Sequence, residues 1–264
     1  MDNWLRPVAD TGLMISPVGF GTVKLGRNEQ VKYPTAFEIP DDKKALELLA
    51  LARDLGINLL DTAPAYGTSE ERLGGLIKGQ RDQWIICTKV GEEFENGESR
   101  FDFTPEHIRK SIERSLQRLK TDYLDMVLVH SDGNDVEIIE RYGCLDVLND
   151  LKREGLIRAT GMSTKTVEGG IKVLEQADCA MVTWNLNEQG EREVLDYAAR
   201  HGKSILVKKA LASGHLAAGE DPVQKSMDFV FAHPGVTSAV LGTINPKHME
   251  QNVQAVRQVI LSHT

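Results

Sequence analysis

The sequence contains little cysteine, and its cysteines have no arrangement that would bind a metal or build a disulfide framework. Cys87, Cys144 and Cys179 are the only three in 264 residues. They are scattered, odd in number and without CxxC spacing, which is typical of reduced thiols in a cytoplasmic protein. We therefore expect no metal centre, no disulfide and a cytoplasmic location.

Long hydrophobic runs and blocks of positive charge are also missing. No segment reaches the roughly 20 apolar residues that a membrane span requires, and the N-terminal MDNWLRPVADTG lacks the apolar run of a signal peptide. With 31 Lys and Arg against 39 Asp and Glu, the net charge is −8, and no basic stripe is present that would neutralise phosphates. Neither a membrane nor a nucleic acid is expected as a partner.

No low-complexity linker or break in composition divides the chain. The composition, 41% hydrophobic and 27% charged, is ordinary for a globular protein with a large core. We interpret residues 1–264 as a single domain.

The chain does contain a regular alternation of short β-rich runs and amphipathic helical stretches. Helical stretches such as 41–56, 104–120 and 246–262 have apolar residues three and four apart, and several begin with Asp, Thr-Pro or Asn-Pro start signals. Eight βα units in a chain of this length indicate a (β/α)8 TIM barrel, with residues 6–19 as an N-terminal β-hairpin that closes its floor. The candidate strands are 18–22, 58–62, 84–90, 123–131, 157–163, 180–184, 204–210 and 238–243.

Three polar residues end consecutive predicted strands: Asp61, Lys89 and His130. Each alone has an ordinary explanation, as a helix cap, a surface lysine and a hydrogen-bonded core histidine respectively. The C-terminal ends of barrel strands, however, are where catalytic groups gather. The occurrence of these three polar residues together, with Tyr66 on the loop after Asp61, favours a catalytic site at the barrel mouth.

These four residues suit one kind of chemistry. A tyrosine is a poor acid because its pKa is about 10, but a nearby ammonium such as Lys89 stabilises the phenolate and is expected to lower that pKa. Asp61 would keep the lysine charged and oriented, and His130 would donate a hydrogen bond to a carbonyl oxygen or share the proton relay. The set predicts a proton donor for a carbonyl group that receives a hydride.

The same segments resemble the aldo-keto reductases. The resemblance rests on LLDTAPAYGTSEERLG, CTKVG and LVHSDG around the four polar residues, and on VGFGTVKLG, TGMST, VKKALASG and GTINPKHMEQN at strands 1, 5, 7 and 8. It covers nearly the whole chain in the right order, and several motifs together are far more specific than any one alone. It implies NAD(P)H-dependent reduction of aldehydes or ketones to alcohols, with Tyr66 as proton donor and Asp61, Lys89 and His130 as the other catalytic residues.

The resemblance also implies a nicotinamide cofactor bound across the barrel mouth. No G-x-G-x-x-G follows a strand, so the usual dinucleotide fingerprint is absent. A helix N-terminus at the strand 8 corner suits an anion. By position, Gly21, Thr22 and Asp61 would lie near the nicotinamide, Ser163 at its carboxamide, Lys208, Leu211 and Ser213 along the ring and pyrophosphate, and Thr243, His248, Gln251 and Asn252 at the adenosine phosphate.

Several positions depart from the family pattern. Thr164 replaces an asparagine, Met181 a glutamine, and Lys208 the aromatic residue that usually stacks on the nicotinamide. The lysine and arginine that commonly bind the 2′-phosphate of NADPH correspond to Gly242 and His248. We expect NADP, with NAD as the alternative, and a preference that is weaker than usual and stronger at lower pH, where a histidine gains charge.

The expected cover over the mouth is small. The segment 211–227 is short and no segment follows the last predicted helix, which leaves the loop 23–42 and the turn after His130. An open mouth discriminates poorly among substrates, so we expect a broad reductase of reactive aldehydes that binds its substrates weakly. The alternative is that a neighbouring chain in an oligomer supplies the missing wall.

Two other functions stay open from the sequence. Lys89 or Lys208 would suit a Schiff-base aldolase, although the spacing of Asp61 and Tyr66 then has no purpose. The second alternative is a non-catalytic sensor or regulatory protein that binds a nicotinamide cofactor. The complete set of four catalytic residues argues against it.

Overall fold

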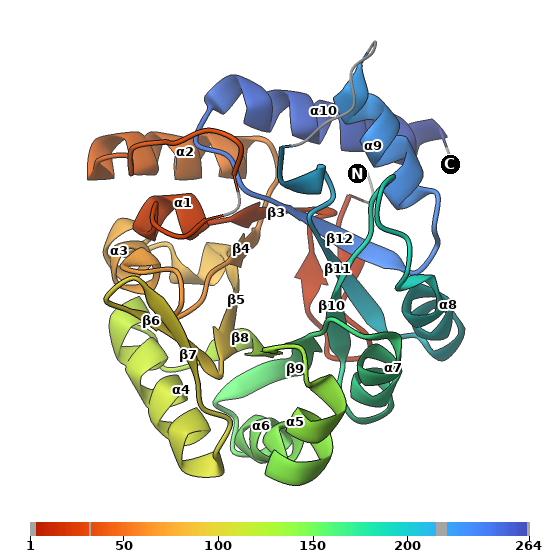
Figure 1. The fold of residues 1–264 in the computed structure, drawn as a ribbon. Coiled ribbons are helices and arrows are strands. Elements are labelled where there is room, and N and C mark those ends of the chain that lie inside the picture. The colour runs from red at the N-terminus through yellow and green to blue at the C-terminus, as the bar shows by residue number, and fades with distance from the viewer. Residues whose placement is uncertain (1–3, 32, 215–220, 263–264) are drawn as a thin grey trace.

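Eight parallel strands close into a barrel in the computed structural model, which describes residues 4–31, 33–214 and 221–262 (Figure 1). The predicted (β/α)8 barrel is therefore confirmed, and each predicted strand is found with its ends within two residues. In order around the barrel the strands are β3 (Val18–Gly21), β4 (Leu59–Asp61), β5 (Ile85–Val90), β8 (Leu124–His130), β9 (Ile157–Ser163), β10 (Cys179–Thr183), β11 (Ser204–Lys208) and β12 (Val236–Leu241), which pairs with β3.

Helices surround the barrel and begin where the sequence signals predict. The side chain of Asp41 accepts a hydrogen bond from Lys44 N, and Thr104, followed by Pro105, accepts one from His107 N. No helix in the described ranges is long and apolar enough to cross a membrane. The helices are α1 (Val23–Gly26), α2 (Asp42–Asp54), α3 (Ser69–Leu76), α4 (Pro105–Leu119), α5 (Asp135–Tyr142), α6 (Cys144–Arg153), α7 (Val167–Gln176), α8 (Arg192–His201), α9 (Pro222–Phe231) and α10 (Pro246–Ser262), with short 3-10 turns at Arg81–Gln83 and Ala212–Gly214.

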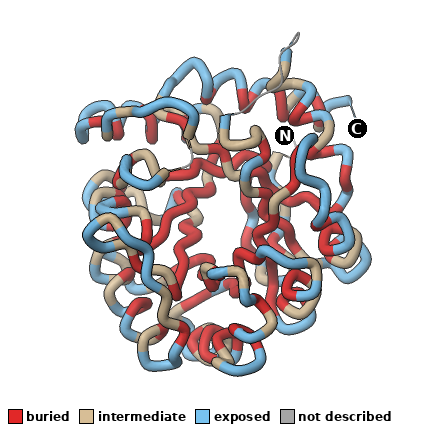
Figure 2. Tube along the Cα trace, viewed as in Figure 1, coloured by how far each residue is buried: buried red, intermediate tan, exposed pale blue. Residues whose placement is uncertain are grey.

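The predicted N-terminal hairpin closes one end of the barrel. Strands β1 (Arg6–Pro7) and β2 (Met14–Ile15) pair antiparallel. Val8, Leu13 and Ile15 of this segment are buried in one cluster with side chains from the barrel interior. The barrel is therefore a packed core above an apolar floor, and Figure 2 shows its strands as buried almost throughout.

The inward-facing side chains of β4 and β5 are apolar near the floor of the barrel and polar at its mouth. Side chains two residues apart point to the same side of a strand. Leu59 and Cys87 are completely buried in the floor cluster, and the next inward positions on their strands are Asp61 and Lys89. Cys87 is thus a core residue, as expected, and burial raises the pKa of its thiol.

A second hairpin, which the sequence analysis did not predict, follows β5 directly. Strands β6 (Glu92–Glu95) and β7 (Glu98–Phe101) pair antiparallel through a turn at Asn96 and Gly97, whose φ angles of 53° and 81° match a type I′ turn. Gly91, with φ 102°, allows the chain to leave β5 in this direction, because a Cβ there would lie 2.6 Å from the Phe103 ring.

Candidate active site

Asp61 and Lys89 form a buried ion pair at the ends of the neighbouring strands β4 and β5. The Lys89 Nζ atom donates to Asp61 Oδ1 at 2.5 Å and to the Thr62 carbonyl at 3.0 Å. Asp61 is only 3% and Lys89 only 1% exposed. Burial lowers the pKa of Lys89, but the charge of Asp61, with smaller contributions from Tyr66 and Cys87, outweighs it and raises the pKa overall. The ammonium is therefore held charged and in one place.

Tyr66 completes this group from the loop between β4 and α3. Its hydroxyl donates to Asp61 Oδ2 at 3.4 Å, and Lys89 Nζ lies 4.7 Å from the centre of its ring. The loop is tight: Tyr66 N donates to the Ala63 carbonyl at 3.0 Å. Gly67 has φ 60°, and a Cβ there would lie 2.2 Å from the Gly26 carbonyl oxygen. The short loop thus holds the phenol against the ion pair.

The acidity of Tyr66 differs from the sequence expectation. Burial, then the charge of Asp61, raises the pKa of the phenol, and the lowering by Lys89 does not compensate. The expectation of a net lowered pKa is wrong because the phenol is buried and because the Asp61 carboxylate, which shares the ammonium, also acts on the tyrosine. Tyr66 is consequently protonated near neutral pH, which is the form that a proton donor needs.

His130 ends β8 and faces the tyrosine. The two rings meet edge to face, with centroids 6.4 Å apart and planes at 88°. Burial lowers the pKa of His130, Glu92 opposes this, and Lys89 and Lys208 lower it further. All four residues predicted as catalytic are therefore close together at the mouth.

Gly21 and Thr22 lie beside Asp61 at the end of β3. Gly21 is paired with Asp61 in register, and the Thr22 hydroxyl donates to the Asp61 carbonyl at 2.8 Å and contacts Ser69 Oγ at 2.8 Å. The side chain of Thr22 thus fixes the end of β4, and through it the position of Asp61.

Ser163 and Lys208 form a second polar pair across the mouth. Lys208 Nζ donates to Ser163 Oγ at 2.9 Å and to the Thr164 carbonyl at 2.7 Å, and Ser163 is in register with His130. Burial lowers the pKa of Lys208 to about 8, with Glu191 opposing. No carboxylate in the described residues lies within ion-pair distance of this amine.

The remaining predicted cofactor residues lie after β11 and at the start of α10. Leu211 and Ser213 are partly buried in the turn after β11, whereas residues 215–220 of the expected covering loop lie outside the described residues. On α10, His248 and Gln251 are exposed and Asn252 is buried. Gln251 and Asn252 follow His248 by three and four positions, so these residues lie on neighbouring parts of the same side of the helix.

The start of α10 is capped by side chains of the preceding turn. Thr243 Oγ1 accepts from Asn245 N at 3.1 Å, and Asn245 Oδ1 accepts from Lys247 N at 3.0 Å. The helix then runs for 17 residues from Pro246, so its N-terminal end carries a favourable dipole for phosphate. The donor set, an amine and a hydroxyl at the mouth and a helix N-terminus beside them, fits the amide and phosphate groups of a nicotinamide dinucleotide.

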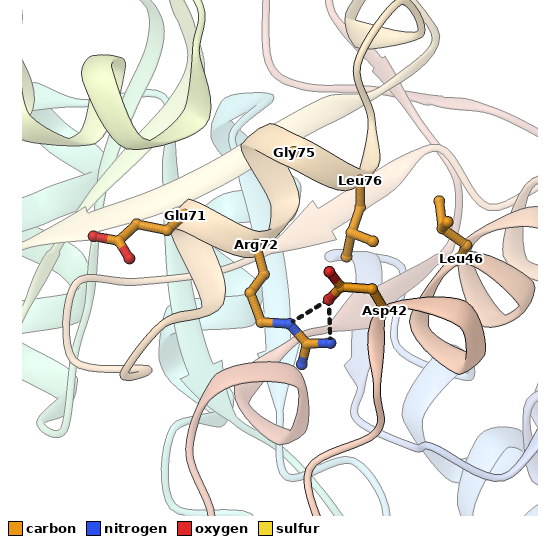
Figure 3. Close-up of a pocket in the computed structure, with 6 residues that line it drawn as sticks. All are labelled: Asp42, Leu46, Glu71, Arg72, Gly75 and Leu76. Carbon is orange, nitrogen blue, oxygen red and sulfur yellow. Dashed lines mark hydrogen bonds and ion pairs between the residues drawn. The ribbon is translucent and has the colours of Figure 1, made fainter.

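Two surface depressions lie away from this group. One of about 590 Å³ lies between α2 and α3 and is lined by Asp42, Leu46, Glu71, Arg72, Gly75 and Leu76 (Figure 3). Arg72 forms an ion pair with Asp42 at 2.8 Å and donates to the Pro40 carbonyl at 2.7 Å, so it joins α3 to the start of α2. A groove of about 370 Å³ between α9 and α10 includes Gln251. Neither contains a residue predicted as catalytic.

Sequence reasoning missed two residues near the catalytic group. Glu92 lies 2.8 Å from His130, and the Asn-Gly pair after β6 is the signal that would have revealed its hairpin. Tyr33 follows α1 in the first loop, and burial together with the charge of Asp61 raises its pKa to about 12. Its ring contacts Lys24, whose Nζ lies 4.0 Å from the ring centre. No sequence pattern marks Tyr33.

The closed (β/α)8 barrel carries tyrosine, lysine, aspartate and histidine together at its mouth, which is an arrangement suited to a barrel oxidoreductase. The family model described as the Aldo/keto reductase family matches residues 17–225. The chain belongs to this family.

Three relatives show how far the similarity extends. A Pseudomonas aeruginosa protein classed among the aldo-keto reductases is 57% identical, with 98% of this chain and 96% of that chain covered and a TM-score of 0.90. The holo form of a Bacillus halodurans aldo-keto reductase is 25% identical, with 98% and 95% covered and a TM-score of 0.79. The aldo-keto reductase YhdN of Bacillus subtilis is 35% identical over 216 residues, which are 79% of this chain but only 62% of the relative.

Proposed function

We propose that the protein reduces aldehydes or ketones to alcohols with NADPH, with NADH as the alternative, and that Tyr66 donates the proton. The observation that carries this proposal is the position of the Tyr66 hydroxyl, 3.4 Å from Asp61 Oδ2 and next to the buried Lys89 ammonium. A buried acid beside a fixed cation is suited to an oxygen atom that gains negative charge.

A nicotinamide cofactor held at the mouth would supply a hydride to the carbonyl carbon. Tyr66 gives its proton to the carbonyl oxygen, so the product is an alcohol and the residue becomes a tyrosinate. Lys89 stabilises that tyrosinate because its ammonium lies 4.7 Å from the ring centre. Asp61 keeps Lys89 charged and oriented, and His130, whose ring meets the Tyr66 ring edge to face, would donate a hydrogen bond to the carbonyl oxygen.

Residues around the mouth would hold the cofactor. Ser163, joined to Lys208 at 2.9 Å, would bind the carboxamide, and Lys208, Leu211 and Ser213 would line the nicotinamide ring and the pyrophosphate. Thr243, His248, Gln251 and Asn252 would hold the adenosine phosphate at the start of α10. We favour NADP on family grounds, although a histidine replaces the usual arginine.

One observation keeps a Schiff-base aldolase as the second candidate. Its nucleophile would be Lys208, since burial lowers the pKa of this amine to about 8, which leaves part of it uncharged near neutral pH. Lys89 is unsuited to this role because Asp61 raises the pKa of its ammonium.

Three measurements on the same purified protein distinguish the candidates. Purified protein is mixed with NADPH and 4-nitrobenzaldehyde, and the nicotinamide absorbance is followed. Loss of absorbance that requires both protein and aldehyde supports the reductase. A protein adduct trapped by borohydride without cofactor, and lost in Lys208→Met, supports the aldolase. Cofactor binding without turnover for any aldehyde or ketone tested contradicts the reductase and supports a sensor.

A further inference from the structure

The carboxylate of Glu92 lies against the imidazole of His130. Glu92 Oε2 is 2.8 Å from His130 Nδ1. This nitrogen is buried and forms no hydrogen bond of standard geometry with any described residue, so its contact with the carboxylate is a close polar contact rather than an aligned hydrogen bond. Two lone pairs at 2.8 Å would repel each other, and Nδ1 must therefore carry a proton.

The opposite side of the imidazole is free to meet a substrate. The His130 side chain is 21% exposed although its Nδ1 is buried, so the exposed edge consists of other ring atoms. Nε2 forms no hydrogen bond with any residue in the described part of the chain. A ring with its only proton on Nδ1 presents a lone pair at Nε2, which accepts and cannot donate.

We propose that Glu92 is a positioning residue that keeps a proton on His130 Nδ1, so that His130 donates a hydrogen bond from Nε2 to a substrate carbonyl only as the imidazolium. This inference rests on the proposed reductase function. It makes the charge state of His130, and not merely its presence, a condition for rapid reduction.

The hairpin holds Glu92 firmly enough for this role. Ser99, on the opposite strand β7, donates from Oγ to Glu92 Oε1 at 2.7 Å. The Arg27 guanidinium lies 3.4 Å from the centre of the Phe94 ring and donates to the Ala65 carbonyl at 3.0 Å. Arg27 thereby ties the hairpin that carries Glu92 to the loop that carries Tyr66.

Glu92 is ionised throughout the useful pH range. Burial raises the pKa of its carboxyl group, but the contacts with His130, Ser99 and the Arg27 charge outweigh burial and lower the pKa to about 2. The carboxylate therefore remains a proton acceptor for His130 whatever the assay pH.

The charges around His130 fix the direction of the pH dependence. Glu92 on β6 favours the imidazolium, whereas Lys89 on β5 and Lys208 on β11 oppose it, and burial is the largest effect, so the pKa of His130 is lowered. Tyr66 faces the ring as a neutral phenol. As pH rises through this lowered pKa the imidazolium is lost, and the rate of reduction is expected to fall by about tenfold per pH unit.

The test compares Glu92→Gln with Glu95→Gln. Glu95 is exposed on the same strand, so its variant removes the same charge without touching His130. A glutamine amide can donate to Nδ1, which allows the neutral ring to carry its proton on Nε2. We therefore expect wild type and Glu95→Gln to lose activity with rising pH, and Glu92→Gln to retain it.

Nitrogen-15 NMR of the histidines gives a readout that needs neither cofactor nor turnover. The His130 signal is assigned by its loss in His130→Gln. Neutral His130 should carry its proton on Nδ1 in wild type and on Nε2 in Glu92→Gln. A neutral wild-type ring protonated on Nε2 would overturn the proposal, as would a Glu92→Gln pH profile that falls like wild type or falls at lower pH. Inactivity with all carbonyl compounds would refute the reductase function but leave the NMR result readable.

Discussion

Lys89 Nζ and Asp61 Oδ1 are 2.5 Å apart, and both side chains are almost completely buried. The pair joins β4 to β5 at the point where Tyr66 approaches. A buried pair of this kind is worth little as a source of stability compared with apolar packing, but breaking one partner is costly. Its position therefore indicates a role in the chemistry of Tyr66 rather than in folding.

Lys89→Met should damage both stability and turnover. It leaves the Asp61 carboxylate buried without a counter-charge, which costs about 3 to 5 kcal/mol, and removes the cation that stabilises the tyrosinate. Urea denaturation and turnover measurements test the two effects separately. The control is the double variant Asp61→Asn with Lys89→Met, in which no buried charge is left uncompensated. It should regain most of the stability and none of the turnover, and a double variant as unstable as the single one would show that the pair is wrongly assigned.

Lys208 should make cofactor binding depend on pH and on the oxidation state of the nicotinamide. Burial lowers its pKa to about 8, so the amine is charged below that pH and neutral above it. The oxidised nicotinamide ring is itself positive and is repelled by the charged amine. The affinity for NADP⁺ relative to NADPH should therefore rise as pH increases through about 8.

Fluorescence titrations of both cofactor forms across this pH range measure the ratio. Lys208→Met should abolish its pH dependence. The neighbouring Lys209 is exposed, and its charge helps to lower the pKa of Lys208, so Lys209→Met should keep the pH dependence but move it to higher pH. Glu191, Lys165 and Asp135 also act on this amine but are common to both variants. An equal pH dependence in wild type and Lys208→Met would place the nicotinamide away from Lys208.

His248→Arg should increase the preference for NADP over NAD. Arginine forms charge-assisted, two-point hydrogen bonds with phosphate, and such bonds contribute roughly 1.5 to 3 kcal/mol, so the ratio of dissociation constants should change by about tenfold or more. Gln254→Arg, at an exposed position further along α10, adds the same charge away from the expected phosphate. If both variants change the ratio equally, the 2′-phosphate does not lie at His248.

The barrel and the positions of the four catalytic candidates follow from local patterns in the sequence. Apolar runs that end in Asp61, Lys89 and His130 mark strand ends, and the barrel topology brings adjacent strand ends together. The net acidity of Tyr66 did not follow, because it depends on burial and on the distances among three charged or polar groups. Those quantities are properties of the packed structure.

Glu92 illustrates a different kind of miss. Its hairpin interrupts the alternation of strands and helices, so that alternation does not predict it, although the Asn96-Gly97 pair is a hairpin signal. Even with the hairpin predicted, the contact with His130 arises from the direction that Gly91 gives to the chain. The pairing of Lys208 with Ser163 likewise depends on the barrel register and not on spacing along the chain.

Tyr66→Phe tests the proposed chemistry most directly. Tyr33→Phe is the matched control, because burial and then the charge of Asp61 raise the pKa of Tyr33, as they raise that of Tyr66. Turnover with NADPH and 4-nitrobenzaldehyde, together with the cofactor dissociation constant, is measured for both variants. Tyr66→Phe should lower turnover by roughly 10² to 10⁴ with little change in cofactor affinity, and Tyr33→Phe should keep most of the activity. A Tyr66→Phe enzyme as active as wild type would contradict the role of Tyr66 as proton donor.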